Sequence, residues 1–226
     1  MSTTYAIFIK DLRNKSNLSQ QEMAKRLGIS RTSYISIEQG KRELSLKEAG
    51  VLTELFNITM EDLLSGRDNK HQKYEQMLFA FLRNISGDGM ITKTKLAKLL
   101  YLADFGWFYD TYKSMSGLSY RKIEYGPVPD YYFRLLAELE GDGKIAIKFK
   151  DNAQLISETR TGQRVADDLI STKEKKFIKK IAIKWQEKDT KEIVYFTHSQ
   201  IPYVFSDKGA IIPYELITQE DFGHVY

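Results

Sequence analysis

Apolar positions near the start of the chain recur with helical period, in short runs that serine and glycine separate. Ser19 stands three residues before Glu22, the spacing of a capping box, in which two side chains satisfy free backbone N–H groups at a helix start. Gly28 suits the left-handed residue that ends a helix, and Ser30 can cap the next helix. The pattern predicts five short helices between residues 4 and 64.

From residue 73 onward aromatic residues become frequent, and helical and alternating patterns are mixed. Alternation predicts strands at residues 119–125 and 145–149, with residues 154–158 as the hairpin partner of the second strand. Helical periodicity predicts helices at residues 74–85, 94–112, 130–140, 161–170, 173–187 and 192–198. Residues 125–129, Tyr-Gly-Pro-Val-Pro, predict a sharp turn from a strand into a helix.

The segment between these two parts, residues 65–72, contains no apolar side chain and includes two turn formers. We therefore place a linker at residues 67–72, between a domain of residues 1–66 and a domain of residues 73–226. The expected fold class is mainly α: an all-α five-helix domain, followed by a helix-rich α+β domain with a small antiparallel sheet.

The segment 94–112 is apolar on nearly every side of its predicted helix. This pattern is typical of a helix that is buried inside a domain or covered by a partner. Burial in the core is the first interpretation, and cover by a partner protein is the alternative.

Composition narrows the class of protein only slightly. The 226 residues carry 34 lysines and arginines against 30 aspartates and glutamates, a net charge of +4 that permits a nucleic-acid partner without identifying one. The absence of cysteine excludes disulfides, thiolate metal sites and a cysteine nucleophile. No apolar stretch approaches the roughly 18 residues that a membrane span needs, and the first ten residues lack the pattern of a secretion signal. We therefore expect a cytoplasmic protein without a membrane partner.

The sequence contains no recognisable catalytic constellation. Its three histidines lack metal-binding spacing, and no nucleophile elbow, P-loop or dinucleotide fingerprint occurs. His198 is the one candidate for acid–base chemistry, and a histidine near a helix end more often makes a structural hydrogen bond. We expect no enzyme, no metal and no cofactor; an enzyme of unknown type that uses His198 is the weakest alternative.

The run from Ser19 to Arg42 has the order of two short helices joined by a turn that contains glycine, which is helix-turn-helix geometry. Seven residues of the run stand in a register typical of one family of DNA-binding domains: Gln20, Ala24, Gly28, Ser30, Ile37, Glu38 and Gly40. Residues 5–64 thereby resemble the lambda-repressor-like, or XRE-like, helix-turn-helix family, although Tyr34 stands where that family usually has isoleucine or valine. The resemblance implies binding to double-stranded operator DNA.

Helix-turn-helix geometry assigns roles to individual side chains, because the third helix lies in the major groove with its first residues against base edges. Arg31 can read guanine with two hydrogen bonds, and Thr32 and Ser36 can reach base edges. Gln20, Lys41 and Arg42 suit phosphate contacts. The predicted DNA-binding residues are Gln20, Ser30, Arg31, Thr32, Ser33, Ser36, Lys41 and Arg42. The alternative for Arg31 and Arg42 is that they are solvated surface charges.

The charge of the first domain bears on its oligomeric state. Residues 1–66 hold nine basic and eight acidic side chains, so a single copy has little net charge with which to neutralise phosphates. Dimerisation doubles the number of phosphate contacts. We therefore expect a homodimer on an inverted repeat, with half-sites about one helical turn apart.

A second resemblance lies in the larger part of the chain. Residues 95–104, Lys-Leu-Ala-Lys-Leu-Leu-Tyr-Leu-Ala-Asp, are followed by Tyr120 and by the run Glu-Tyr-Gly-Pro-Val at residues 124–128. Thr197-His198, Pro202 and the segment 211–217 fit the same pattern. Residues 73–218 thereby resemble the Panacea domain of SocA-like antitoxins. The resemblance implies a domain that neutralises a toxic protein by direct binding, in some members behind a DNA-binding domain.

The predicted helix at residues 173–187 is rich in lysine. Several lysines stand four residues apart, and each such pair is unfavourable by about 0.2–0.5 kcal/mol on an exposed helix. A solvated charged face is the first explanation, and an acidic partner surface or a DNA backbone that relieves the repulsion is the alternative. The candidate partner-binding residues are Tyr120, Tyr125, Lys176, Lys179 and Lys180.

These patterns together predict the antitoxin of a toxin–antitoxin system. It would neutralise a cognate protein toxin by direct binding and repress its own operon through the helix-turn-helix domain. The main rival is a phage-type transcriptional regulator whose second domain senses a small ligand or signal.

Overall fold

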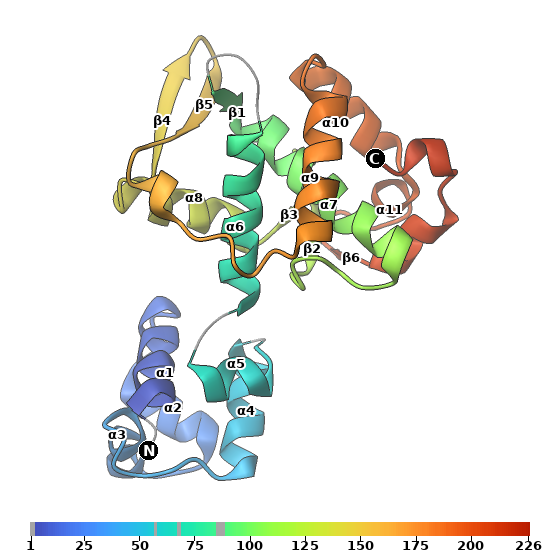
Figure 1. Cartoon of the computed structure of the whole chain (residues 1–226). Coiled ribbons are helices and arrows are strands. Elements are labelled where there is room, and N and C mark those ends of the chain that lie inside the picture. Colours follow the sequence, from blue (N-terminus) through green and yellow to red (C-terminus); the bar gives the residue numbers. More distant parts are fainter. Residues whose placement is uncertain (1–2, 57, 67–68, 85–88) are drawn as a thin grey trace. The chain divides into compact units, whose positions relative to one another are not determined.

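The computed structural model describes residues 3–56, 58–66, 69–84 and 89–226, and the chain divides into two compact units, Met1–Asn69 and Lys70–Tyr226 (Figure 1). Within the described residues the first unit is all-helical, and the second combines helices with small antiparallel sheets. The expected fold class is therefore confirmed.

The first unit is built from short helices whose ends are fixed by local hydrogen bonds. Its helices are α1 (Thr3–Lys15), α2 (Gln20–Leu27), α3 (Arg31–Glu38), α4 (Leu46–Phe56) and α5 (Met60–Ser65). Ser19 and Glu22 form the predicted capping box at the start of α2, and Gly28 ends that helix at a φ of 68°. The Oγ of Ser30 accepts a hydrogen bond of 3.1 Å from the backbone N–H of Ser33 and thereby caps α3.

A single cluster of buried side chains forms the core of the first unit. Its members are Tyr5, Ala6, Ile9, Met23, Ala24, Leu27, Tyr34, Ile37, Ala49, Leu52, Ile58 and Leu63. Each large apolar side chain that is fully buried contributes about 1.5–3 kcal/mol relative to an exposed one. Tyr34 is completely buried, so the core beneath α3 accommodates a phenol ring.

The second unit surrounds one long helix with shorter helices and strands (Figure 1). Its helices are α6 (Asn69–Arg83), α7 (Lys93–Thr111), α8 (Tyr131–Gly141), α9 (Thr172–Trp185), α10 (Thr190–Ser199) and α11 (Ile201–Val204). Its strands are β1 (Met90–Thr92), β2 (Tyr120–Ile123), β3 (Gly126–Pro129), β4 (Ile145–Lys150), β5 (Ala153–Glu158) and β6 (Ile211–Ile212). Short 3-10 segments cover Gly162–Arg164, Tyr214–Gln219 and Phe222–His224.

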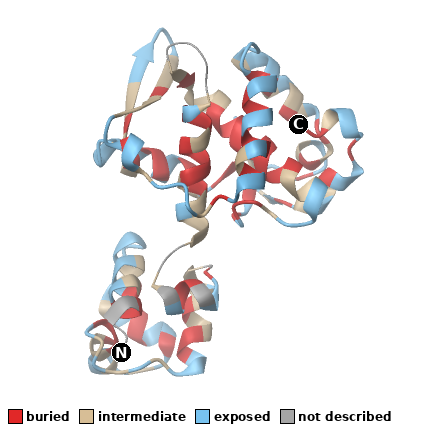
Figure 2. Cartoon of the chain, viewed as in Figure 1, coloured by how far each residue is buried: buried red, intermediate tan, exposed pale blue. Residues whose placement is uncertain are grey.

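Helix α7 is the centre of the second core. All its residues from Leu96 to Gly106 are buried, and α7 packs against α9, α10, β1, β3 and β5 (Figure 2). The first interpretation of this apolar segment, burial inside the domain, is therefore confirmed. Its two ends are partly exposed, and the residue that caps its carboxyl end, Tyr112, is 74% exposed.

The strands form two antiparallel sheets of three strands each among the described residues, with the orders β1-β5-β4 and β3-β2-β6. The predicted hairpin of β4 and β5 is confirmed, with Ile147 opposite Ile156. The sequence predicted only one small sheet, because β1 and β6 are too short for alternation to reveal them.

The predicted turn from strand into helix at residues 125–129 is wrong. Gly126 to Pro129 form β3, which pairs with β2 so that Ile123 faces Gly126 and Tyr120 faces Pro129. The tight connection is made by Glu124 and Tyr125, and Gly126 has a φ of 100°. Two prolines are tolerated in β3 because it is the edge strand of its sheet, where a missing N–H interrupts no ladder.

Two further predictions differ from the structure. The helix expected at residues 161–170 is only the 3-10 turn Gly162–Arg164, because side chains from α6 bind the backbone there: Arg83 donates to the carbonyls of Gly162 and Val165, and Gln76 accepts from the N–H of Leu169. At the linker placed at 67–72, α6 already begins at Asn69, and residues 67–68 lie outside the described residues.

Candidate DNA-binding and partner-binding sites

Helices α2 and α3 form the helix-turn-helix element of the first unit. They pack against each other over the fully buried Ala24, and residues 28–30 connect them. The buried side of α3 carries Tyr34, Ile37 and Glu38. Because these residues face the core, the start of α3 presents its other side to solvent.

The exposed start of α3 contains the predicted base-reading side chains. Arg31 and Thr32 are exposed, and Arg31 forms no ion pair within the described part of the chain. The serines are more constrained: Ser30 and Ser33 lie with their hydroxyl oxygens 2.9 Å apart, and Ser36 Oγ donates to the Thr32 carbonyl at 3.1 Å. Arg31 and Thr32 are therefore the side chains of this group that are free to contact DNA.

A buried ionic cluster beneath α3 was not foreseen from the sequence. Arg13 Nε lies 2.6 Å from Glu38 Oε1, and Gln20 Nε2 donates to Glu38 Oε2 at 3.0 Å. Burial alone would raise the pKa of Glu38, but the hydrogen bonds from Arg13 and Gln20 outweigh it and hold that pKa below its usual value. The cluster joins α1, α2 and α3, and it directs the Gln20 amide N–H inward. An acidic residue on the apolar side of α3 is the sequence signal that could have revealed it.

The predicted phosphate contacts after α3 differ in their freedom. Lys41 is exposed, whereas Arg42 is half-buried with its Nη2 2.8 Å from Glu48 Oε1. Glu48 also accepts from the backbone N–H of Ser45 and helps to start α4. Arg42 thus has a structural role in holding the loop, and Lys41 is the cation there that faces solvent.

In the second unit, the two candidate tyrosines lie in opposite environments. Tyr120 is completely buried and its hydroxyl donates to the carbonyl of Leu100 at 3.3 Å, so its selection as a partner-binding residue is corrected: it belongs to the core. Its ring packs against the rings of Phe105 and Tyr214. Tyr125, at the tip of the β2–β3 hairpin, is 70% exposed.

The lysine-rich helix α9 relieves part of its charge repulsion within the chain. Lys180 Nζ lies 2.9 Å from the hydroxyl of Tyr226 and 4.7 Å from the centre of its ring, and Lys184 donates to the Tyr226 carbonyl. Lys175 forms an ion pair with Asp167. Lys176 and Lys179 are exposed and have no ion-pair partner among the described residues, so they are the free members of the predicted set.

A buried amine next to His198 was also missed from the sequence. Lys98 has no solvent exposure, its Nζ donates to the Tyr125 carbonyl at 2.5 Å, and burial lowers the pKa of this amine to about 7. A side chain at Gly126 would collide with both Lys98 Nζ and His198 Nε2, so the two groups converge on this glycine. Burial, together with the nearby Lys98, lowers the pKa of His198, whose ring stacks on Tyr203 at 4.2 Å. The arrangement packs the hairpin tip against α7 and α10.

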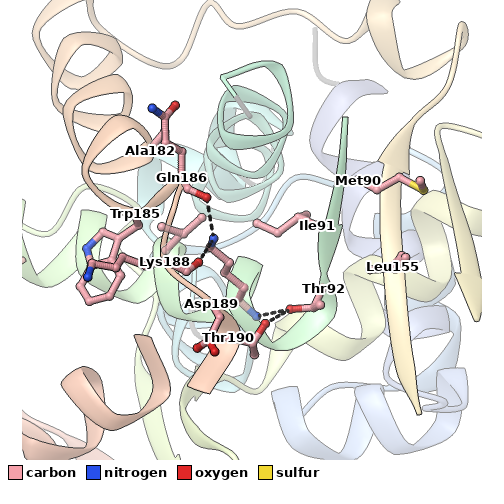
Figure 3. A pocket seen from close by; sticks show the side chains of 12 residues that line it. Met90, Ile91, Thr92, Leu155, Ala182, Trp185, Gln186, Lys188, Asp189 and Thr190 are labelled. Atoms are coloured by element: carbon pink, nitrogen blue, oxygen red, sulfur yellow. Dashed lines mark hydrogen bonds between the residues drawn. The ribbon is translucent and has the colours of Figure 1, made fainter. Parts of the chain in front are cut away.

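A hollow of about 290 Å³ lies between β1, the end of α9 and the start of α10 (Figure 3). Its polar groups mostly bind one another: Lys95 donates to the carbonyls of Gln186 and Lys188, and the hydroxyls of Thr92 and Thr190 lie 2.8 Å apart.

Across the residues that the structure describes, no group of three or more histidines and carboxylates could hold a metal ion. None of the described helices is long and apolar enough to span a bilayer.

The fold and the exposed start of α3 define a helix-turn-helix DNA-binding protein with a second domain attached. Residues 9–63 match the helix-turn-helix family, and residues 96–202 match the family described as antitoxin SocA-like, Panacea domain. The chain belongs to the helix-turn-helix transcriptional regulators through its first domain and carries an antitoxin-like Panacea domain behind it.

Curated relatives match the first domain. An HTH-type transcriptional regulator of Archaeoglobus fulgidus is 42% identical over 55 residues, which are 24% of this chain and 78% of that protein. A regulator of the same type from Methanocaldococcus jannaschii is 39% identical over 62 residues, 27% of this chain and 94% of the relative. The HTH-type transcriptional regulator AnsR of Bacillus subtilis is 37% identical over 70 residues, 31% of this chain and 60% of AnsR. No solved structure matches the chain significantly.

Proposed function

We propose that the protein is the antitoxin and autorepressor of a toxin–antitoxin operon. Its helix-turn-helix domain binds operator DNA in the cytoplasm, and its Panacea domain binds a cognate protein toxin and neutralises it without catalysis by this chain. The observation that carries the proposal is the presence, in one chain, of a DNA-binding domain with a free Arg31 and of an antitoxin-like domain.

The DNA-binding part of the proposal rests on the geometry of α3. Arg31 and Thr32 occupy the exposed start of the helix that such domains place in the major groove, and Lys41 faces solvent in the loop that follows. One copy supplies few phosphate contacts, so two copies on an inverted repeat are the proposed DNA-bound state.

Replacing Arg31 with alanine is expected to weaken operator binding by about tenfold to one-hundredfold, which is the effect of losing one bidentate hydrogen-bonded contact to a base. The measurement is the dissociation constant for the operator and for an unrelated duplex, at one fixed salt concentration. Arg160→Ala removes an exposed arginine of the second unit and serves as the control. If Arg31→Ala lost the same affinity for both duplexes, Arg31 would be a phosphate contact and its role in base reading would be wrong.

The toxin-binding part is tested by co-expression. The gene next to this one, expressed alone, is expected to arrest growth, and co-expression of the full chain is expected to restore it. Arg31→Ala should restore growth as well as the native chain does, because toxin binding needs no DNA contact. Rescue that requires Arg31 would instead indicate that the chain acts by repressing transcription, and a neighbouring product that is harmless alone would contradict the proposal.

A sensor of a small ligand is the second candidate function, and the hollow beside Lys95 is the observation that favours it. Its volume of about 290 Å³ lies at the lower end of the range for small-molecule sites. Lys95 and the two threonines already bind backbone carbonyls or one another, and Lys188 pairs with Glu192, which leaves few polar groups to orient a ligand. A small molecule that changes operator affinity in the absence of any toxin would favour this function over the antitoxin.

A further inference from the structure

Two adjoining hollows border the start of α7 in the second unit. One, of about 540 Å³, lies between the start of α7 and the β4–β5 hairpin and is lined by Phe149 among others. The other, of about 190 Å³, lies between α7, β3 and α8 and is lined by Phe133 among others. Lys93, Thr94 and Tyr125 line both, so the hollows adjoin, and we call the two together the lysine–aromatic groove.

Three aromatic side chains stand at this groove with much of their surface in water. Tyr125 comes from the β2–β3 hairpin, Phe133 from α8 and Phe149 from β4, and they are 70%, 43% and 76% exposed. Exposed apolar patches of this kind mark surfaces that a partner covers, and aromatic side chains supply much of the binding energy when they are buried at an interface. Because the three rings come from three separate elements, the surface suits a broad partner such as a polypeptide.

The electrostatic character of the groove is positive. Lys93 lines both hollows and supplies this charge, and no carboxylate among the described residues lines them. Lys93 forms no ion pair in the described part of the chain, and its Nζ lies 5.0 Å from the centre of the Phe133 ring. The groove also begins at the amino end of α7, which carries the positive end of the helix dipole.

We infer that the lysine–aromatic groove is the toxin-binding surface of the Panacea domain, and that it binds a segment of the toxin in which an acidic side chain stands next to an apolar one. This inference rests on the proposed function and names the surface that performs it. The acidic group pairs with Lys93, and the apolar side chain lies between Tyr125 and the exposed aromatic rings. Lys98 keeps the hairpin tip in place through its bond to the Tyr125 carbonyl.

The test uses the full chain and the purified product of the neighbouring gene, inactivated at its own active site. Tyr125→Ala and Phe149→Ala remove exposed side chains, so the fold should be retained and thermal unfolding should be unchanged. Each is expected to weaken toxin binding by about tenfold or more, and Lys93→Glu by a similar factor. Tyr195→Ala and Lys208→Glu alter exposed positions outside the groove and are expected to bind within about twofold of the native chain.

The outcomes separate this inference from the proposed function. If the native chain binds the toxin and all three groove variants bind equally well, the groove is not the site, whereas the antitoxin function stands. If the native chain does not bind the toxin, the proposed function itself is wrong. A charge exchange adds a specific readout: an acidic residue of the toxin changed to lysine should restore binding to Lys93→Glu. If the groove variants lost binding to single-stranded nucleic acid but still bound the toxin, the groove would be a nucleic-acid site. The inference would then be wrong.

Discussion

Replacing Glu38 with alanine is expected to lower the unfolding free energy of the first unit by about 2 kcal/mol, because it leaves a largely buried guanidinium with only the Leu18 carbonyl as a partner. Arg13 is only 12% exposed at its side chain, and Glu38 accepts hydrogen bonds from both Arg13 and Gln20. The same change should abolish operator binding, since the cluster holds α3 against α1 and α2. The loss is indirect, because Glu38 lies on the core side of α3.

The measurement for Glu38 is hydrogen exchange of the backbone amides in α1, α2 and α3 of the full chain, together with operator affinity. Glu43→Ala removes an exposed carboxylate nearby and should change neither quantity. The double change Arg13→Met with Glu38→Met removes both charges and should recover most of the lost protection. Because the folded pKa of Glu38 lies below its usual value, its stabilisation is present above that usual value and is lost as the pH falls through the folded pKa. Unchanged exchange in Glu38→Ala would contradict this account.

Replacing Lys98 with methionine is expected to stabilise the second unit at pH 6 by about 3 kcal/mol, the cost of the buried charge less one lost hydrogen bond. The side chain has no exposure, and burial lowers the pKa of its amine from the usual 10.5 to about 7. Methionine has a similar volume and no charge, so it can fill the same space. The carbonyl of Tyr125 loses one donor but stays at an exposed turn, where water can replace it.

The pH dependence gives the Lys98 prediction its sign. Above pH 7 the folded amine releases its proton while the unfolded amine keeps it, so the unfolded state binds more protons and stability rises with pH. The difference in unfolding free energy between Lys98→Met and the native chain should therefore shrink by about 1.4 kcal/mol per pH unit between pH 7 and 9. Urea unfolding at several pH values measures it, with the exposed Lys113→Met as the control. A difference that stays constant with pH would show that Lys98 is not neutralised by burial.

The first unit was largely predictable because its signals are local. Ser19, Gly28 and Ser30 each act on backbone groups within a few residues, and each has the cap role that its position indicates. The pairing of Arg13 with Glu38 was not predictable from such signals, because it joins residues on two helices that only the tertiary fold brings together. For the same reason, the spacing that suggests a phosphate contact at Gln20 could not reveal where its amide points.

The second unit was predictable where burial follows periodicity and not where tertiary contacts override it. The apolar helix around Leu100 has the central place that its pattern indicates. The helix expected at residues 161–170 fails because Arg83 and Gln76, far away in sequence, bind its backbone. Asp104 has no periodic signal at all: it is fully buried and accepts hydrogen bonds from the backbone N–H groups of Met115 and Ser116. Exposure of Tyr125 and burial of Tyr120 likewise follow from the hairpin that their strands form.

The two prolines of β3 limit how copies of this protein can associate. A strand that joined the outer side of β3 would need backbone donors along it, and Pro127 and Pro129 have none to offer. The sheets of successive molecules therefore cannot join into one continuous sheet by strand pairing at this edge. Copies that bind neighbouring sites on one DNA duplex therefore do not join their sheets by strand pairing at this edge.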